Sequence, residues 1–217
     1  MKALLSAAAC AAGFLTLSVS HADEVETGFG YFFNTTVQSE PLVFIDGRSG
    51  ENNGAGVLTR DHDSLRIALH LSELDPNTYY TVWWSVFNNS GRCTESPCAL
   101  PGDIIAGAGQ SINAGGFISG EDGVANVSYE LPRGSIPSGL DRGSRFVPII
   151  DPDFEVGLRR PFRSEIQMVI RRHGPVGSGD PVGQLTLFDG GCPGFPEFSG
   201  CQDQQLVIFD PIRRRRH

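Results

Sequence analysis

Short runs in which apolar and polar residues alternate dominate the chain, and they predict strands. In residues 65–71, leucine or isoleucine stands at every second position, which is typical of a half-buried strand. Residues 79–87 are rich in aromatic and β-branched side chains, which favours a central strand. Further strands are predicted at residues 27–33, 42–45, 114–119, 124–131, 164–172, 184–188 and 205–209.

Glycine and proline separate these runs. The chain contains 27 glycines and 14 prolines, and breaks this frequent leave no room for long helices. Residues 120–123 carry a glycine at each end, and they predict a hairpin between two strands. Residues 46–56 and 134–163 lack a period and are interpreted as long surface loops. The pattern predicts an all-β protein, an immunoglobulin-like β-sandwich with long loops.

The first residues predict export. Lys2 precedes an apolar run over residues 3–19 that is too short to span a bilayer comfortably, and Ser20 and Ala22 fit the small positions of a signal-peptidase site. We therefore expect a signal peptide over residues 1–22 and a secreted or periplasmic protein. No transmembrane segment is expected after cleavage.

The remaining chain is interpreted as a single sandwich domain over residues 23–210, followed by a basic, disordered tail over residues 211–217. The formal net charge is −8. Phosphate binding draws its affinity from clustered lysine and arginine, so this acidic balance argues against a nucleic-acid partner.

Four cysteines follow the predicted cleavage site: Cys93, Cys98, Cys192 and Cys201. An even number of cysteines in an exported chain indicates disulfides, and proximity favours the pairs Cys93–Cys98 and Cys192–Cys201. The alternative, a zinc site made of all four thiolates, lacks the two-residue spacing of a zinc ribbon. We expect two local disulfides and no metal.

A tyrosine motif resembles one known class of domains. Leu74, Pro76 and Tyr80 have the spacing seen in fibronectin type III and related immunoglobulin-like domains, where a tyrosine hydroxyl bonds to the backbone at the corner between two sheets. The resemblance implies that Tyr80 is a structural corner residue, and it implies no chemistry.

Two further resemblances come from other motifs. The segment Val-Trp-Trp at residues 82–84 with Phe87 and Asn88, together with Glu-Ile-Gln-Met-Val-Ile-Arg-Arg-His-Gly-Pro at residues 165–175, resembles an uncharacterised family of exported bacterial proteins. The later segment and the predicted hairpin at residues 120–123 also weakly resemble the chordin-type repeat. That strand often carries histidines in such repeats, and this chain has Gln167 instead. Neither resemblance implies an activity.

No catalytic or cofactor site is predicted. Serine, histidine and acidic residues occur without a spacing that selects a triad, and no Gly-x-Ser-x-Gly elbow is present. Asp61, His62 and Asp63 are interpreted as a charged loop, and the acidic residues at 151–155 lack the glycine and terminal glutamate of a calcium-binding EF-hand. We therefore name no catalytic residue, cofactor or metal ligand.

One feature could form a ligand surface. Alternate residues of a strand point to opposite faces. In residues 79–87, one face carries Tyr79, Trp83 and Phe87 together with Thr81 and Ser85, and the other face is entirely apolar. An aromatic stripe could stack a planar or sugar-like ligand or dock a partner. The alternative is that the cysteine-containing loop after residue 87 covers it.

These observations favour an exported binding or surface-structural module of unknown ligand, acting with a ligand or protein partner at the cell envelope. The alternatives are a metal-dependent enzyme on the same scaffold and a self-assembling surface subunit that uses exposed strand edges.

Overall fold

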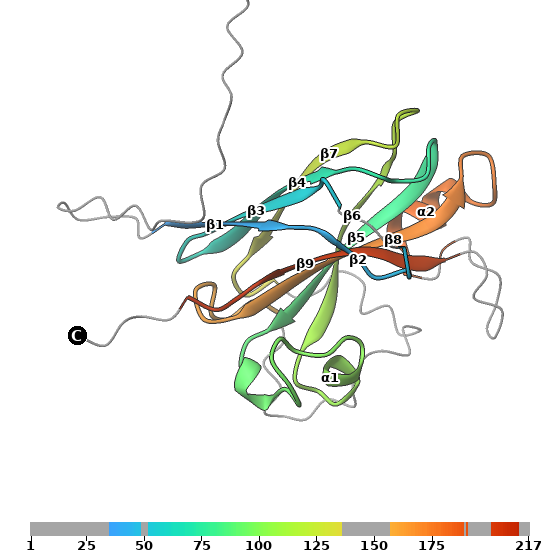
Figure 1. Ribbon diagram of the computed structural model, residues 1–217. Coiled ribbons are helices and arrows are strands. Elements are labelled where there is room, and N and C mark those ends of the chain that lie inside the picture. The colour runs from blue at the N-terminus through green and yellow to red at the C-terminus, as the bar shows by residue number, and fades with distance from the viewer. Residues whose placement is uncertain (1–34, 49–51, 136–156, 189, 191–200, 213–217) are drawn as a thin grey trace, which may run out of the picture. The chain divides into compact units, whose positions relative to one another are not determined.

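The computed structural model describes residues 35–48, 52–135, 157–188, 190 and 201–212, all within one compact unit. The predicted signal peptide, the predicted strand at residues 27–33 and the basic tail after Ile212 lie outside these residues. Within the described parts, nine strands form two antiparallel sheets, which confirms the all-β prediction (Figure 1).

The first sheet has four strands in the order β1-β3-β4-β7. The second has five strands in the order β2-β9-β8-β5-β6, with β5 and β8 at its centre. The bounds are β1 (Thr36–Pro41), β2 (Val43–Phe44), β3 (Ala55–Arg60), β4 (Ser64–Leu71), β5 (Thr78–Phe87), β6 (Gln110–Ile118), β7 (Ala125–Pro132), β8 (Glu165–Pro175) and β9 (Gln202–Phe209).

The facing sides of the two sheets share one apolar core. Strand β4 contributes the alternating leucine and isoleucine side chains seen in the sequence. Strand β5 contributes Tyr80, Val82, Trp84 and Val86, all at most 1% exposed. The apolar parity of β5 therefore faces the core, as expected. Burying each such side chain stabilises the fold by roughly 1.5–3 kcal/mol, so this core is its main source of stability.

Arg60 joins the two sheets at one end of the core. It lies on β3 and is completely buried. Its guanidinium donates to the carbonyl oxygens of Ser164, Phe209 and Asp210 at 2.9, 3.2 and 3.1 Å, beside β8 and β9 of the other sheet. A buried guanidinium needs such acceptors for its N–H groups. Here the backbone supplies them, together with the side-chain oxygen of Gln38, which accepts from Arg60 Nε at 2.6 Å.

Two local predictions were wrong. Residues 120–123 form a turn, but β6 before it lies in the five-stranded sheet and β7 after it lies in the four-stranded sheet. The turn therefore crosses between sheets and does not close a hairpin. Residues 184–188 are not a strand, because residues 184–186 form the second half of α2 (Pro181–Thr186). This helix has Asp180 as its N-cap and Pro181 in its first turn.

Two strands were missed. Strand β1 was not predicted, and the start of β3 fell in the predicted loop at residues 46–56. Both strands carry serine, glycine or threonine between their apolar positions, so their alternation is weak. The short helix α1 (Gly102–Ile105) lies in a loop that extends beyond the strands in Figure 1.

Candidate functional site

Residues 88–109 connect β5 to β6, and we call them the clipped loop. Strands β5 and β6 are hydrogen-bonded neighbours, with Val86 paired to Gln110. A hairpin turn of two to five residues is enough to join such a pair. The clipped loop is much longer than this, so the strand pairing does not explain its length.

A disulfide closes the middle of the clipped loop. Cys93 and Cys98 are bonded, which confirms the predicted pair. Asp103 then fixes the backbone around the ring: its carboxylate accepts hydrogen bonds from Thr94 N at 2.9 Å and Ala99 N at 2.7 Å. The bond from Thr94 is the main reason that the pKa of Asp103 is lowered, because hydrogen bonds to a carboxylate favour its charged form.

Two side chains of β8 hold the clipped loop on the sheet. Glu165 Oε1 accepts a hydrogen bond from Cys98 N at 2.9 Å, and Gln167 Nε2 donates to Cys98 O at 2.8 Å. Gln167 also donates to Glu165 at 2.7 Å. Both side chains are 1% exposed. The backbone of Cys98 is thus bound on both sides by buried polar groups.

A small second core lies beneath the loop. Phe87, Cys98 and Ile104 are buried together there, apart from the main core. The backbone approaches so closely that a Cβ added to Gly109 would lie 2.3 Å from the ring of Phe87. Only glycine fits at this position.

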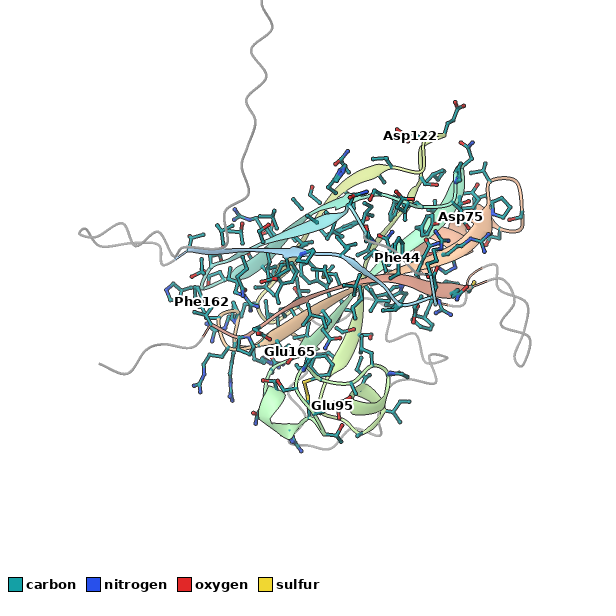
Figure 2. All side chains as sticks on the ribbon, in the orientation of Figure 1. Phe44, Asp75, Glu95, Asp122, Phe162 and Glu165 are labelled. Carbon is teal, nitrogen blue, oxygen red and sulfur yellow. A yellow bond between two sulfur atoms is a disulfide. The ribbon has the colours of Figure 1, made fainter. Side chains whose placement is uncertain are left out.

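The outer side of the clipped loop is exposed. Residues 94–97 are exposed, and Ile105 on α1 is 60% exposed although its neighbour Ile104 is buried. In Figure 2, Glu165 lies where the loop meets the strands, and Glu95 lies within the loop beyond it. The loop is therefore fixed from below and presents an apolar side chain outward.

The structure does not present Tyr79, Trp83 and Phe87 as an exposed stripe. Tyr79 is 5% exposed and Phe87 is fully buried, while Trp83 is half-buried. The second core covers Phe87, and Phe188 packs edge-on against Trp83 at 5.1 Å. The burial favours the alternative that other segments cover this face: the clipped loop covers Phe87, and Phe188, from a distant part of the chain, covers Trp83.

A hydrogen-bond chain runs along the same face. Trp83 Nε1 donates to Thr81 Oγ1 at 2.8 Å, and Thr81 Oγ1 lies 2.7 Å from His173 Nε2. His173 Nδ1 lies 2.7 Å from the carbonyl oxygen of Gly190 and so donates to it. The contact between Thr81 and His173 thus extends the chain of hydrogen bonds from Trp83 to Gly190. A hydroxyl beside an imidazole is also the arrangement of a nucleophile and its base, but Thr81 is completely buried.

The predicted corner residues lie at the start of β5. The hydroxyl of Tyr80 accepts a hydrogen bond from Asp75 N at 2.9 Å. Leu74 is in the core and Pro76 is exposed. Burial raises the pKa of Tyr80 to about 12. This contact to the preceding backbone is of the kind that a tyrosine corner makes.

The remaining cysteines and the metal alternative are only partly described. Cys192 lies outside the described residues, so its pairing with the buried Cys201 stays a prediction. Among the described residues, the one group of three potential metal ligands that lie close together is Cys93, Cys98 and Asp103. Its two sulfurs are bonded to each other here.

The outer face of the four-stranded sheet is built differently, and we call it the bare face. Its side chains are mostly small and its central row runs Ser39, Val57, Ala68 and Ser128 across the four strands. Nearly all side chains of this face are exposed. Two of them, His70 and Asn126, form a 2.9 Å hydrogen bond with each other. The members are Val37, Ser39, Pro41, Ala55, Val57, Thr59, Arg66, Ala68, His70, Asn126, Ser128 and Glu130.

No protein-family model, curated protein or solved structure matches the chain. In the part of the chain that the structure describes, neither helix has the length and apolar character needed to cross a membrane.

Proposed function

We propose that this chain is an exported, non-catalytic binding module that presents the clipped loop to a protein partner at the cell envelope. The observation that carries the proposal is the way the loop is built. Two buried carboxylates, a disulfide and a separate apolar core hold a connection that strand pairing does not require.

A loop held in this way suits recognition. Binding residues are commonly placed on loops that a rigid scaffold positions. Because the backbone is already fixed at Thr94, Cys98 and Ala99, the loop loses little conformational freedom on binding, and this favours affinity. The exposed Ile105 supplies an apolar anchor that a pocket on a partner protein can bury.

The test compares two exposed apolar residues on the same side of the five-stranded sheet. Ile105→Asp changes the clipped loop, and Val182→Asp changes α2, where Val182 is 69% exposed. Each variant is immobilised and incubated with solubilised envelope proteins from the source cells, and quantitative mass spectrometry measures what is retained.

We expect one protein to be retained by the wild type and by Val182→Asp and to be lost with Ile105→Asp. Retention that Ile105→Asp leaves unchanged, or loss with both variants, would place recognition elsewhere on the molecule.

The self-assembling alternative has support from the edge of the four-stranded sheet. Among the described residues, β1 pairs only with β3, and its Val37 is 59% exposed. An unpaired strand edge can pair with a second chain. Light scattering after size exclusion, from micromolar to millimolar protein, separates the two functions, since a monomer throughout contradicts assembly.

The immunoglobulin-like fold is also part of the proposal, supported by strand order. In such domains strands A, B and E share one sheet, and G, F, C and C′ share the other. The order β3-β4-β7 in one sheet corresponds to A-B-E, and the order β9-β8-β5-β6 in the other corresponds to G-F-C-C′. The strands also follow one another along the chain in the sequence that this arrangement requires. The buried Trp84 on β5 then occupies the place of the strand C tryptophan. Strands β1 and β2 are additions, and Tyr80 stands on β5 where such domains carry the corner on strand F.

A further inference from the structure

The sulfurs of Cys93 and Cys98 and a carboxylate oxygen of Asp103 all lie within 4.8 Å of one another. Cys98 and Asp103 are buried, and Cys93 is half-buried. The four residues between the cysteines fall within the spacing found in structural zinc sites. We propose that reduction of the Cys93–Cys98 disulfide converts the clipped loop into a zinc site made of Cys93, Cys98 and Asp103.

The anchors of the loop do not depend on the disulfide. Cys98 is held through its backbone by Glu165 and Gln167 on β8, and its side chain packs with Phe87 and Ile104. When the S–S bond breaks, these contacts keep the Cys98 sulfur near its place. A ligand that stays in position lowers the conformational cost of forming a metal site.

Asp103 is also held in advance. Its two oxygens each accept one backbone N–H, from Thr94 and Ala99, and the Thr94 side chain bonds to the same carboxylate. Because a carboxylate has about four lone-pair sites, one is left for a metal. Hydrogen bonds of this kind orient a ligating carboxylate and keep it charged. Two thiolates with one carboxylate select zinc over magnesium or calcium, which prefer all-oxygen sites.

The chemical steps balance with a dithiol as reductant. One thiolate of the dithiol attacks a sulfur of the pair, the S–S bond breaks, and a mixed disulfide forms. The second thiol of the reductant resolves it, so the dithiol is oxidised to its disulfide and Cys93 and Cys98 become thiols. Zinc binding then releases their two protons to water. Three protein ligands leave the fourth position of a tetrahedral zinc ion for a water molecule, and the half-burial of Cys93 is compatible with solvent access to the site.

The test uses the full exported chain, reduced under anaerobic conditions and freed of reductant. Zinc affinity is measured by competition with a chromophoric chelator, and cadmium is used as a probe because thiolate-to-cadmium charge transfer reports sulfur ligation. We expect one equivalent of zinc to bind to the reduced protein and none to the oxidised protein.

Variants assign the ligands. Cys93→Ser and Asp103→Asn should each weaken zinc binding by at least about tenfold. Cys201→Ser is the matched control, since reduction also exposes any thiol in that region, and it should leave the affinity unchanged. Circular dichroism of each reduced variant separates loss of the site from loss of the fold.

Three outcomes overturn the proposal. The first is a reduced, folded protein that binds no zinc, and the second is binding without a sulfur-to-cadmium band. The third is binding that Cys201→Ser abolishes and Cys93→Ser does not. Cys201 Sγ lies 3.4 Å from His173 Nδ1, so the metal would then lie beside His173. The recognition role is unaffected by any of these results, since it is tested on the oxidised protein.

Discussion

The outer face of the four-stranded sheet carries small, exposed side chains, whereas that of the five-stranded sheet lies beneath the clipped loop and α2. The covered face holds Thr81, Glu165 and Gln167 at no more than 1% exposure. The bare face holds threonine and glutamate as well, but in contact with water. Similar residue types therefore have different structural roles on the two sheets. On the covered face they bind distant segments of the chain, and on the bare face they keep the surface polar.

The largest difference in stability between matched substitutions on the two faces should appear where a covering segment contacts a strand directly. A Cβ added to Gly116 on β6 would lie 2.3 Å from the carbonyl oxygen of Leu185 in α2. Because the contact is with backbone, Gly116→Ala should destabilise the fold by about 3 kcal/mol. Ala68→Val on the bare face should change stability by less than about 0.5 kcal/mol. Denaturant melts of both variants measure the contrast, and equal losses would show that α2 is not fixed on the sheet.

The second comparison concerns two glutamates. Glu165→Ala removes the acceptor of Cys98 N and should cost about 2 kcal/mol, since a buried N–H is left unpaired. Glu130→Ala on the bare face, where that side chain is 53% exposed, should cost about 0.5 kcal/mol or less. Glu165→Gln keeps an acceptor and should recover part of the loss. If the alanine variants melt alike, the clipped loop is not anchored through Glu165.

Much of the main core could be predicted from the sequence, and little of the covered face could. The alternation in β4 and β5 is local, and it correctly assigned one parity to the core. The partners of the covered face are distant: Cys98 lies 67 residues from Glu165, and Thr81 lies 92 residues from His173. The pattern of the strand does not decide whether the following loop covers Phe87, so this outcome could be stated only as one of two alternatives.

The errors at α2 and at the sheet crossing have local explanations. Residues 184–188 alternate like a strand, but the Asp180 cap and Pro181 start a helix just before them, and this start signal prevails over the short alternation. The glycines at residues 120 and 123 correctly predicted a turn. A turn does not specify whether the strands on its two sides pair with each other, because that depends on the neighbours of each strand.

A third, smaller difference in stability is expected between substitutions of two threonines, one on each face. Thr81→Val keeps the shape of the side chain but removes the acceptor of Trp83 Nε1, so it should destabilise the fold by about 1 kcal/mol. Thr59→Val on the bare face should be close to neutral. Tryptophan emission provides a second measurement, because the environment of Trp83 should change only in the first variant. A neutral Thr81→Val would argue against the hydrogen-bond chain.

The smallest effect is expected when the pH is lowered far enough to protonate Asp103 in the clipped loop. The pKa of Asp103 is lowered from 3.8 by its backbone hydrogen bonds, first that from Thr94. A lowered folded pKa means that the contribution of Asp103 is present above pH 3.8 and is lost as the pH falls through the folded value. The amide resonances of Thr94 and Ala99 should therefore shift together below pH 3.8, and Asp103→Asn should abolish the shift. Separate midpoints for the two amides would show that the carboxylate does not bridge them.

The turn at residues 120–123 has a consequence for how the molecule unfolds. The chain passes between the sheets there, between β4 and β5, and again between β7 and β8. Neither sheet is thus a continuous stretch of sequence, and Arg60 ties the strand ends of one to the backbone of the other. A sheet that loses its partner loses both its core and its connections, so neither can persist as a separate folding unit. Cooperative, two-state unfolding follows from this interleaving, with tertiary and secondary signals disappearing at the same denaturant concentration.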